Sequence, residues 1–194
     1  MPRAKRRLGQ HFLADPRILA RIVDALDVRP QDTVVEIGPG RGGLTAELVK
    51  RTGNVIAIEK DRDLVGPLQE RFPSIEIVAA DALETDWRAL AGGPYLLAGN
   101  IPYNITSPLL DKALTPPLPS RIVFLVQKEV ADRVTAAPGT SAYGALTIGV
   151  QAVASAERVF TVAAGAFQPR PKIDSAVLRL EPLDQPLVTP AERD

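Results

Sequence analysis

The sequence predicts an α/β fold in which a mostly parallel sheet of seven strands has helices on both faces. Five short, nearly continuous apolar runs lie between residues 33 and 126, and they alternate with longer segments whose apolar residues recur at helical spacing. Strands buried on both faces are typical of parallel sheets whose connections are helices. Two further apolar segments, at residues 153–162 and 173–180, complete the seven strands.

The first predicted helix begins at Asp15-Pro16. Aspartate is a favoured helix cap, and proline suits the first helical position because an N–H there has no helical partner. The helix ends before Arg29-Pro30. It has one apolar face, and the residues on that face are Ile18, Leu19, Ile22, Val23 and Leu26.

The five central strands are predicted at residues 33–37, 55–58, 75–79, 94–98 and 122–126. A Gly-rich turn after the first strand opens a helix that carries Leu44, Leu48 and Val49. The second and third strands are joined by a helix that carries Leu64, Leu68 and Phe72. Pro67 is expected to kink that helix or to limit its first turn.

The regular alternation of strands and helices ends after the fifth central strand. A helix predicted from Thr106 is ended by the prolines at 116, 117 and 119. A polar helix opens at Gln127 and is expected to stop near Pro138, and a short helix follows at residues 143–150. At the end of the chain, residues 189–192 have the pattern of a capping box, which predicts the start of another helix. We therefore expect one domain at residues 1–181, then a linker and the beginning of a helical domain at residues 182–194.

The composition excludes several kinds of chemistry. The 194 residues include no cysteine and one histidine, which excludes disulfides, thiolate nucleophiles and cysteine-rich zinc sites and leaves His11 as the only imidazole. No apolar run is long enough to span a bilayer, and the basic start is not followed by a signal-peptide core. We expect a soluble, cytoplasmic protein.

The charges balance overall but not locally. Basic and acidic residues number 23 each, yet four cations fall within the first seven residues, namely Arg3, Lys5, Arg6 and Arg7. This stretch is either a solvated tail or an arm that contacts phosphates.

A glycine turn follows the first central strand and opens a helix. Gly38, Gly40 and Gly43 satisfy the G-x-G-x-x-G pattern, and Glu59 ends the next strand about 20 residues later, where an acid that binds ribose belongs. This context predicts a nucleotide-type ligand without saying which one.

Two features favour S-adenosylmethionine over NAD. Glu36 lies two residues before the first glycine, where it would repel a pyrophosphate but attract a cationic amino-acid group. Asp81-Ala82 follows the third central strand. There a carboxylate can accept a hydrogen bond from the adenine amine while the next backbone N–H donates to the ring. Glu59 or Asp81 taken singly would be an ordinary solvated acid at a strand end, but both at successive strand ends beside a glycine turn favour a binding site.

Residues 100–103 are suited to hold a planar nitrogen base. The Asn100 side-chain oxygen and the Ile101 carbonyl can accept the two hydrogens of an adenine amine. Pro102 restricts the backbone, and Tyr103 can stack on the base for about 1–3 kcal/mol. Taken alone, the same four residues would be a common turn with a buried tyrosine.

With these features in this order, the sequence resembles the ribosomal RNA adenine N6,N6-dimethyltransferases. These comprise the KsgA-type enzymes of the small subunit and the Erm methylases of the large subunit. The resemblance covers nearly the whole chain and implies a Rossmann-like class I methyltransferase fold. The matching blocks are residues 8–13, 36–45, 59, 81–83, 99–107, 127–130, 143–144 and 167–175.

The resemblance also implies roles for single residues. His11 and Leu13 would line the methionine end of S-adenosylmethionine, with the turn at Gly38 beneath it. The other expected cofactor contacts are Glu36, Gly40, Glu59 at the ribose, Asp81 and Ala82 at the adenine, and Asn100. Tyr103 and Phe167 would form the two faces of a clamp for the target adenine. Arg170 and Lys172 would add RNA contacts to those of the basic arm.

Residues 8–13 and 167–172 are more similar to the KsgA type than to the Erm type. This implies dimethylation of two adjacent adenines in a small-subunit rRNA hairpin loop during ribosome biogenesis, by a monomer without a metal. KsgA-type enzymes have a small helical C-terminal domain that helps to dock the ribosomal subunit. This chain stops where that domain should begin, which puts its substrate affinity in question more than its cofactor binding.

The mechanistic hypothesis is an in-line methyl transfer to the adenine amine without a covalent enzyme intermediate. Three other functions stay open at this point. An NAD-dependent oxidoreductase has only the glycine pattern in its favour. A non-catalytic assembly factor would have no need of the Asn100 amide. A DNA adenine methylase would share the chemistry, but the family blocks outside the site speak against it.

Overall fold

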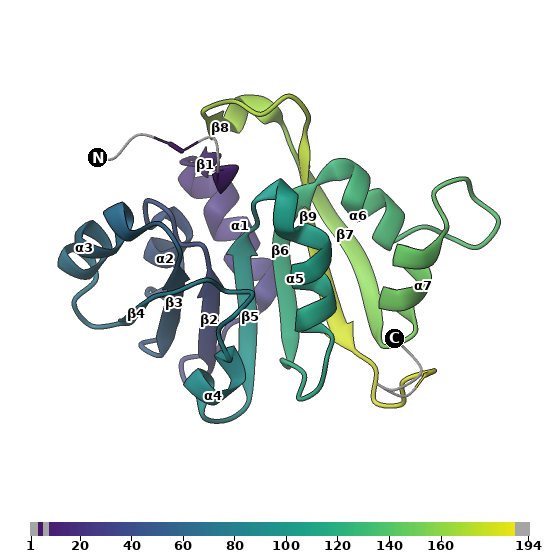
Figure 1. Ribbon diagram of the computed structural model, residues 1–194, viewed down its shortest axis with the longest axis horizontal. Coiled ribbons are helices and arrows are strands. Elements are labelled where there is room, and N and C mark those ends of the chain that lie inside the picture. The colour runs from purple at the N-terminus through teal and green to yellow at the C-terminus, as the bar shows by residue number, and fades with distance from the viewer. Residues whose placement is uncertain (1–3, 6–7, 189–194) are drawn as a thin grey trace.

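A computed structural model describes residues 4–5 and 8–188 of the chain. A seven-stranded sheet forms its centre, in the order β4-β3-β2-β5-β6-β9-β7 (Figure 1). Neighbouring strands from β4 to β6 are parallel, and β9 runs antiparallel to both β6 and β7. The strands of this sheet are β2 (Thr33–Ile37), β3 (Val55–Glu59), β4 (Glu76–Ala79), β5 (Tyr95–Asn100), β6 (Arg121–Gln127), β7 (Ala154–Val162) and β9 (Ser175–Pro182).

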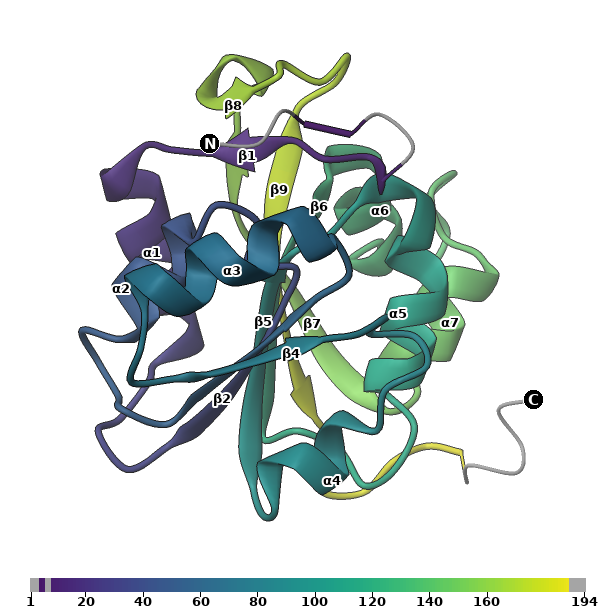
Figure 2. The same ribbon diagram turned by 60° about the vertical axis from the view of Figure 1, so that its left-hand side comes forward.

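Helices cover both faces of the sheet, as Figure 2 shows. On one face α1 (Pro16–Leu26), α2 (Gly43–Leu48) and α3 (Arg62–Arg71) pack against alternate side chains such as Val34 and Leu96. The other face carries α4 (Trp87–Ala91), α5 (Thr106–Ala113), α6 (Lys128–Val134) and α7 (Ala145–Gln151), which pack against Val35 and Leu97. The predicted fold class and all seven predicted strands are confirmed.

Several boundaries differ from the prediction. Helix α6 ends at Val134 rather than near Pro138. The Thr135 hydroxyl donates back to the Ala131 carbonyl, and two side chains of α7 donate to the carbonyls of Arg133 and Val134. Strand β9 begins at Ser175 rather than Ile173, because the Asp174 side chain accepts a hydrogen bond from Ala164 N–H at 2.9 Å. Pro67 lies inside α3, beyond its first turn.

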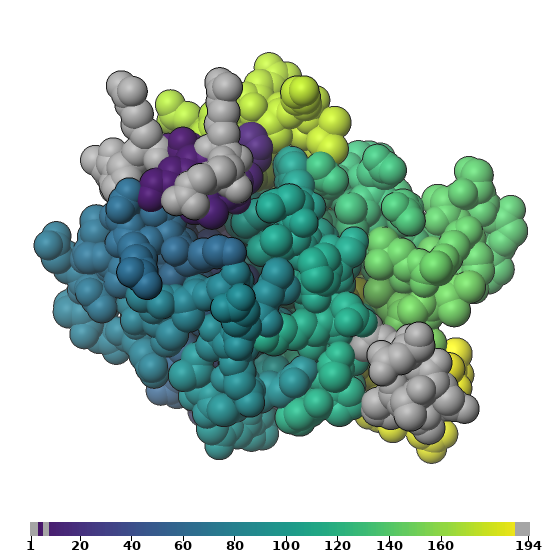
Figure 3. Space-filling view, viewed as in Figure 1, coloured from purple at the N-terminus to yellow at the C-terminus, as the bar shows by residue number. Residues whose placement is uncertain are grey.

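Some short elements were not predicted. These are α4, the 3₁₀ turns η2 (Tyr103–Ile105) and η3 (Ala164–Ala166), and the strands β1 (Phe12–Leu13) and β8 (Phe167–Gln168). The last two pair antiparallel with each other in a separate two-stranded sheet. They bring the N-terminal segment and the loop before β9 to the same end of the molecule, where Figure 3 shows both.

Two predicted features of the chain lie outside the described residues. They are the basic positions Arg3, Arg6 and Arg7 and the capping-box pattern at residues 189–192. The expected division into domains stays a prediction. No helix among the described residues has the length and apolar character needed to cross a membrane.

Candidate active site

A cavity opens at the carboxyl ends of β2, β3 and β5, beside the turns that follow them. The chain leaves β2 through α2 toward β3 and leaves β5 through α5 toward β6, so the connections after these two neighbouring strands diverge and a crevice forms between them at this edge. All the predicted cofactor contacts line this cavity, namely His11, Leu13, Glu36, Gly38, Gly40, Glu59, Asp81, Ala82 and Asn100. Residues 101–103 line it as well.

The glycine turn has the geometry that its pattern requires. Gly38 and Gly40 have φ angles of 66° and 60°, which side chains with a Cβ rarely adopt. The Gly38 N–H donates to the Ile58 carbonyl at 2.9 Å, and the Gly40 N–H donates to Glu59 Oε2 at 2.9 Å. The turn is therefore fixed to the end of β3 and forms one wall of the cavity.

The Glu59 side chain helps to hold the glycine turn in place. It is 5% exposed, and its second oxygen accepts the Asp61 N–H at 2.7 Å. Burial raises the pKa of Glu59, although these backbone hydrogen bonds act in the opposite direction. Each carboxylate oxygen thus already has a backbone partner, and the predicted contact with a ribose would have to be made in addition to them.

Glu36 is a buried acid at the base of the cavity. It is 1% exposed and accepts a hydrogen bond from Thr45 Oγ1 at 2.7 Å. Burial raises the pKa of Glu36 to about 8, and the charge of Glu59 acts in the same direction. A cation bound in the cavity would favour the ionised form of this carboxyl group.

Asp81 and Ala82 line the cavity beyond β4. Asp81 accepts hydrogen bonds from Lys60 Nζ and from the Leu83 N–H, the latter at 3.0 Å. Partial burial acts to raise the pKa of Asp81, but the hydrogen bond from Lys60 and the other favourable contacts lower it. The Ala82 N–H has no hydrogen-bond acceptor within the described part of the chain.

Asn100 is the last residue of β5, as expected. Its Nδ2 donates to the His11 carbonyl at 2.8 Å, which fixes the amide plane and assigns the other atom as oxygen. Among the described residues no donor reaches Oδ1, which therefore stays available as an acceptor in the cavity. Next to it, Ile101 is held by the bond from its N–H to the Leu125 carbonyl at 3.0 Å.

Tyr103 stands at the side of the cavity. Its hydroxyl bonds with Ser175 Oγ at 2.9 Å, and its ring stacks with His11 at a centroid distance of 5.6 Å. His11 Nδ1 donates to the Pro169 carbonyl at 2.8 Å. His11 therefore joins the N-terminal segment to the 167–172 loop, in addition to lining the cavity as the resemblance implies.

Phe167 does not line the cavity. It is 5% exposed and belongs to the apolar cluster that also contains Leu13 and Leu19. In this arrangement Phe167 does not form a second face opposite Tyr103, because β8 is paired with β1 and the ring is packed beneath them. Its clamp role stays a prediction that requires this pairing to move.

The basic residues differ in what they contact. Lys5 does not present a free charge, because its Nζ lies 2.5 Å from carboxylate oxygens of both Asp61 and Asp63. Arg170 and Lys172 are exposed on the loop between β8 and β9. Arg3, Arg6 and Arg7 are outside the described residues, so phosphate contacts remain a prediction for all of these positions.

Three residues that support the site were not predicted from the sequence: Thr45, Lys112 and Ser175. Ser175 and Thr45 lie inside family blocks, but nothing in their own neighbourhoods shows that they would bond to Tyr103 and Glu36. Among the described residues, no group of three or more metal-binding side chains is placed to hold an ion.

Comparisons with known proteins place the chain in a family. The family model described as ribosomal RNA adenine dimethylase matches residues 1–192. The ribosomal RNA small subunit methyltransferase A of Synechococcus elongatus is 46% identical over 95% of this chain and 72% of its own length. The protein of the same name from Xanthomonas euvesicatoria is 47% identical over 93% of this chain and 71% of its own length.

Solved structures agree with this assignment. A dimethyladenosine transferase from Plasmodium falciparum superposes with a TM-score of 0.81 at 34% identity, over 90% of this chain and 64% of that one. The 23S rRNA methyltransferase ErmE superposes with a TM-score of 0.82 at 35% identity, over 94% of this chain and 74% of that one. The chain belongs to the ribosomal RNA adenine dimethylase family.

Proposed function

We propose that this chain is a small-subunit rRNA adenine N6,N6-dimethyltransferase that modifies two adjacent adenines in a hairpin loop, in the cytoplasm. The observation that carries the proposal is the fixed Asn100 amide, whose oxygen is available in the cavity beside Tyr103. The names of the two bacterial relatives favour the small subunit over the large one.

The residues of the cavity fit S-adenosylmethionine. The Ala82 N–H lacks an acceptor among the described residues, and the Asp81 carboxylate beside it can accept a further hydrogen bond. Together they match the donor and acceptor edge of an adenine. At the other end, Glu36 would hold a cationic amino-acid group directly or through water.

When bound, S-adenosylmethionine would supply a methyl group on a positively charged sulfur. The protein's part is to orient the target amine, whose lone pair is otherwise spread into the adenine ring. Asn100 Oδ1 and the Ile101 carbonyl would accept the two amine hydrogens and hold them out of the ring plane. Orientation alone supplies on the order of 7–11 kcal/mol, so the site needs no strong base, and the released proton passes to water.

A second methyl transfer puts a further demand on the site. The monomethylated amine has one hydrogen, so Asn100 and Ile101 can no longer both accept from it. The target base also has to leave its stack, at a cost of a few kcal/mol that is smallest in a loop. Stacking on Tyr103 would compensate for that cost in both rounds.

The test is methyl transfer from labelled S-adenosylmethionine to unmodified small ribosomal subunits, with unmodified large-subunit rRNA in a parallel reaction. We expect two neighbouring dimethylated adenines in the small-subunit RNA, located by nuclease digestion and mass spectrometry. Label confined to large-subunit RNA would instead favour the specificity of the ErmE-like relatives. Label on neither RNA, with S-adenosylmethionine bound and the protein folded, would contradict the proposal.

A further inference from the structure

Lys112 makes an unusual set of contacts at the back of the predicted adenine subsite. It projects from α5, and its Nζ donates to the carbonyls of Ala82 at 3.0 Å, Leu83 at 2.8 Å and Thr85 at 2.7 Å. An ammonium group has three donors, and all three are used on one loop. The Leu83 and Thr85 carbonyls have no other donor among the described residues, so Lys112 alone satisfies them.

The same loop directs its amides toward Asp81. The Leu83 N–H donates to Asp81 Oδ1, and the N–H groups of Glu84 and Thr85 donate to the Asp81 carbonyl at 3.0 Å each. The loop therefore turns its carbonyls toward Lys112 and its amides toward Asp81. Of residues 82–85, Ala82 alone keeps an N–H without an acceptor in the described part of the chain, and Ala82 lines the cavity.

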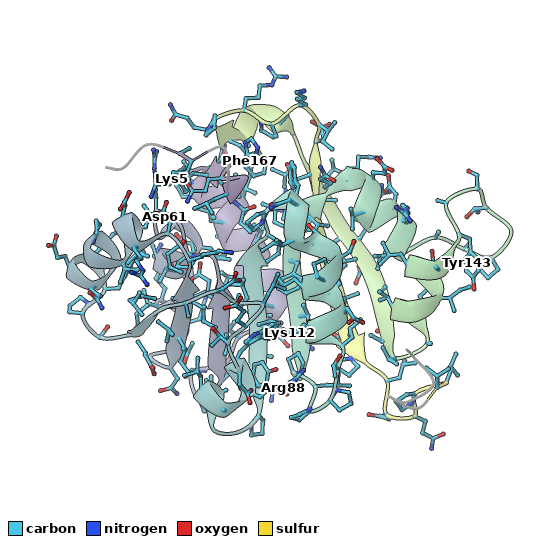
Figure 4. The ribbon with its side chains drawn as sticks, viewed as in Figure 1. Lys5, Asp61, Arg88, Lys112, Tyr143 and Phe167 are labelled. Atoms are coloured by element: carbon cyan, nitrogen blue, oxygen red, sulfur yellow. The ribbon has the colours of Figure 1, made fainter. Side chains whose placement is uncertain are left out.

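Two side chains of α4 add further hydrogen bonds, one to the end of α5 and one to the loop. Arg88 of α4 donates from Nη2 to the Lys112 carbonyl at 2.8 Å and also to the Thr115 carbonyl. Trp87, which is 1% exposed, donates from Nε1 to the Ala82 carbonyl at 2.7 Å. Figure 4 shows Lys112 and Arg88 near each other, between α5 and α4.

Helix α5 also adjoins the methyl-acceptor site. Its first residue, Thr106, donates from Oγ1 to the Pro102 carbonyl at 3.3 Å. One end of the helix thus contacts residues 100–103, and Lys112 near its other end holds the loop of Asp81 and Ala82. The helix connects the two halves of the proposed site.

We propose that Lys112 is a positioning residue that gives the Asp81-Ala82 loop its selectivity for adenine. The inference rests on the proposed use of S-adenosylmethionine. Without the ammonium group, the partly buried carbonyls of Leu83 and Thr85 lose their donor. The loop can then relax, so that the Asp81 carboxylate and the Ala82 N–H no longer match the two atoms of the adenine edge together.

The test compares two ligands that differ at this edge alone, S-adenosylhomocysteine and its inosine counterpart. The inosine form presents an oxygen to the Asp81 carboxylate and an N–H to the Ala82 N–H, so the native loop should reject it. We expect Lys112→Met to lower the preference for the adenine ligand by about tenfold, as the ratio of the two dissociation constants from calorimetric titration. Lys112→Gln, which keeps two donors, should fall between Lys112→Met and the unaltered chain.

The matched control is Lys50→Met, since Lys50 is exposed and bonds with Glu47 away from the cavity. Thermal melting checks that each variant is folded at the temperature of the titration. If Lys112→Met is unfolded there, Lys112→Gln is judged by the same ratio. A purely structural role would weaken both ligands equally, and an unchanged ratio would overturn the inference. If the unaltered chain binds neither ligand, the proposed cofactor itself is wrong and the inference falls with it.

Discussion

Glu36 is the residue whose protonation a bound cofactor should change. Its pKa is raised to about 8 in the free protein, so the carboxyl group is mostly protonated at neutral pH. A cationic ligand favours the ionised form, and binding below pH 8 must then release a proton. We predict that affinity for S-adenosylmethionine rises with pH up to about 8 and then levels off. Titration calorimetry in buffers of different ionisation enthalpy measures the proton release directly.

Glu36→Gln is the control, because it removes the titrating group and keeps a similar shape. Its binding should be weaker and show no proton release. The raised pKa of Glu36 also makes the free energy of unfolding depend on pH. The folded state binds the extra proton between the ordinary pKa of 4.5 and about 8, so this group stabilises the fold at low pH and the contribution is lost as pH rises through that window. Proton release that persists in Glu36→Gln would assign it to another group.

Single residues at the site could be predicted where they belong to a local motif. Residues that act through a contact with a distant part of the chain could not. The placement of Gly38, Glu59 and Asn100 at the cavity follows from their positions at or just after strand ends. Ser175 is separated from Tyr103 by 72 residues and Lys112 from Ala82 by 30, and no local pattern links either pair. The same limit explains Lys5, whose charge suggested an RNA contact but whose partners are the carboxylates at the start of α3.

At the scale of elements, the end of β5 depends on a glycine. A Cβ on Gly99 would lie 2.6 Å from the Ile37 carbonyl oxygen, which belongs to the neighbouring strand and cannot move aside freely. We predict that Gly99→Ala destabilises the protein by about 1–3 kcal/mol and displaces Asn100. Urea denaturation gives the stability, and the rate of methyl transfer reports on the displacement.

Gly93→Ala is the matched control for this substitution. Gly93 precedes the same strand, and a Cβ there meets nothing within 4 Å. We expect its stability and activity to stay near those of the unaltered chain. Equal behaviour of the two variants would mean that close packing at Gly99 does not set the position of Asn100.

The elements themselves were largely readable from the sequence, for a physical reason. Strands β2, β3, β5 and β6 are buried on both faces, so their apolar runs stand out, and α1 has both a cap and an apolar face. Strands β1 and β8 have two residues each, and their paired residues are 154 and 156 positions apart, which leaves no periodicity to detect. Helix α4 was missed because it has only five residues.

At the scale of the molecule, the N-terminal segment is held over the cavity by residues far away in the chain. Lys5 bonds with Asp61 and Asp63, and Gln10 Nε2 donates to Asp61 Oδ2 at 2.9 Å (Figure 4 labels Lys5 and Asp61). We predict that Lys5→Ala speeds amide hydrogen exchange in β1 several-fold and accelerates release of S-adenosylmethionine. Exchange monitored by mass spectrometry and stopped-flow release measure the two effects.

Lys50→Ala serves as the control for loss of a lysine elsewhere on the surface. The global unfolding free energy should change little, because the ion pairs of Lys5 are partly exposed and local opening is separate from global unfolding. Unchanged exchange in β1 after Lys5→Ala would contradict the view that Lys5 holds the segment in place.

The most direct test of the whole account is a paired measurement on Asn100→Ala, namely S-adenosylmethionine affinity and the single-turnover rate of methyl transfer to small ribosomal subunits. The account predicts a folded protein whose affinity changes by at most a few-fold while the rate falls at least about a hundredfold, since orientation of the amine is its main catalytic device. A variant that folds, binds and transfers methyl groups at the normal rate would contradict it.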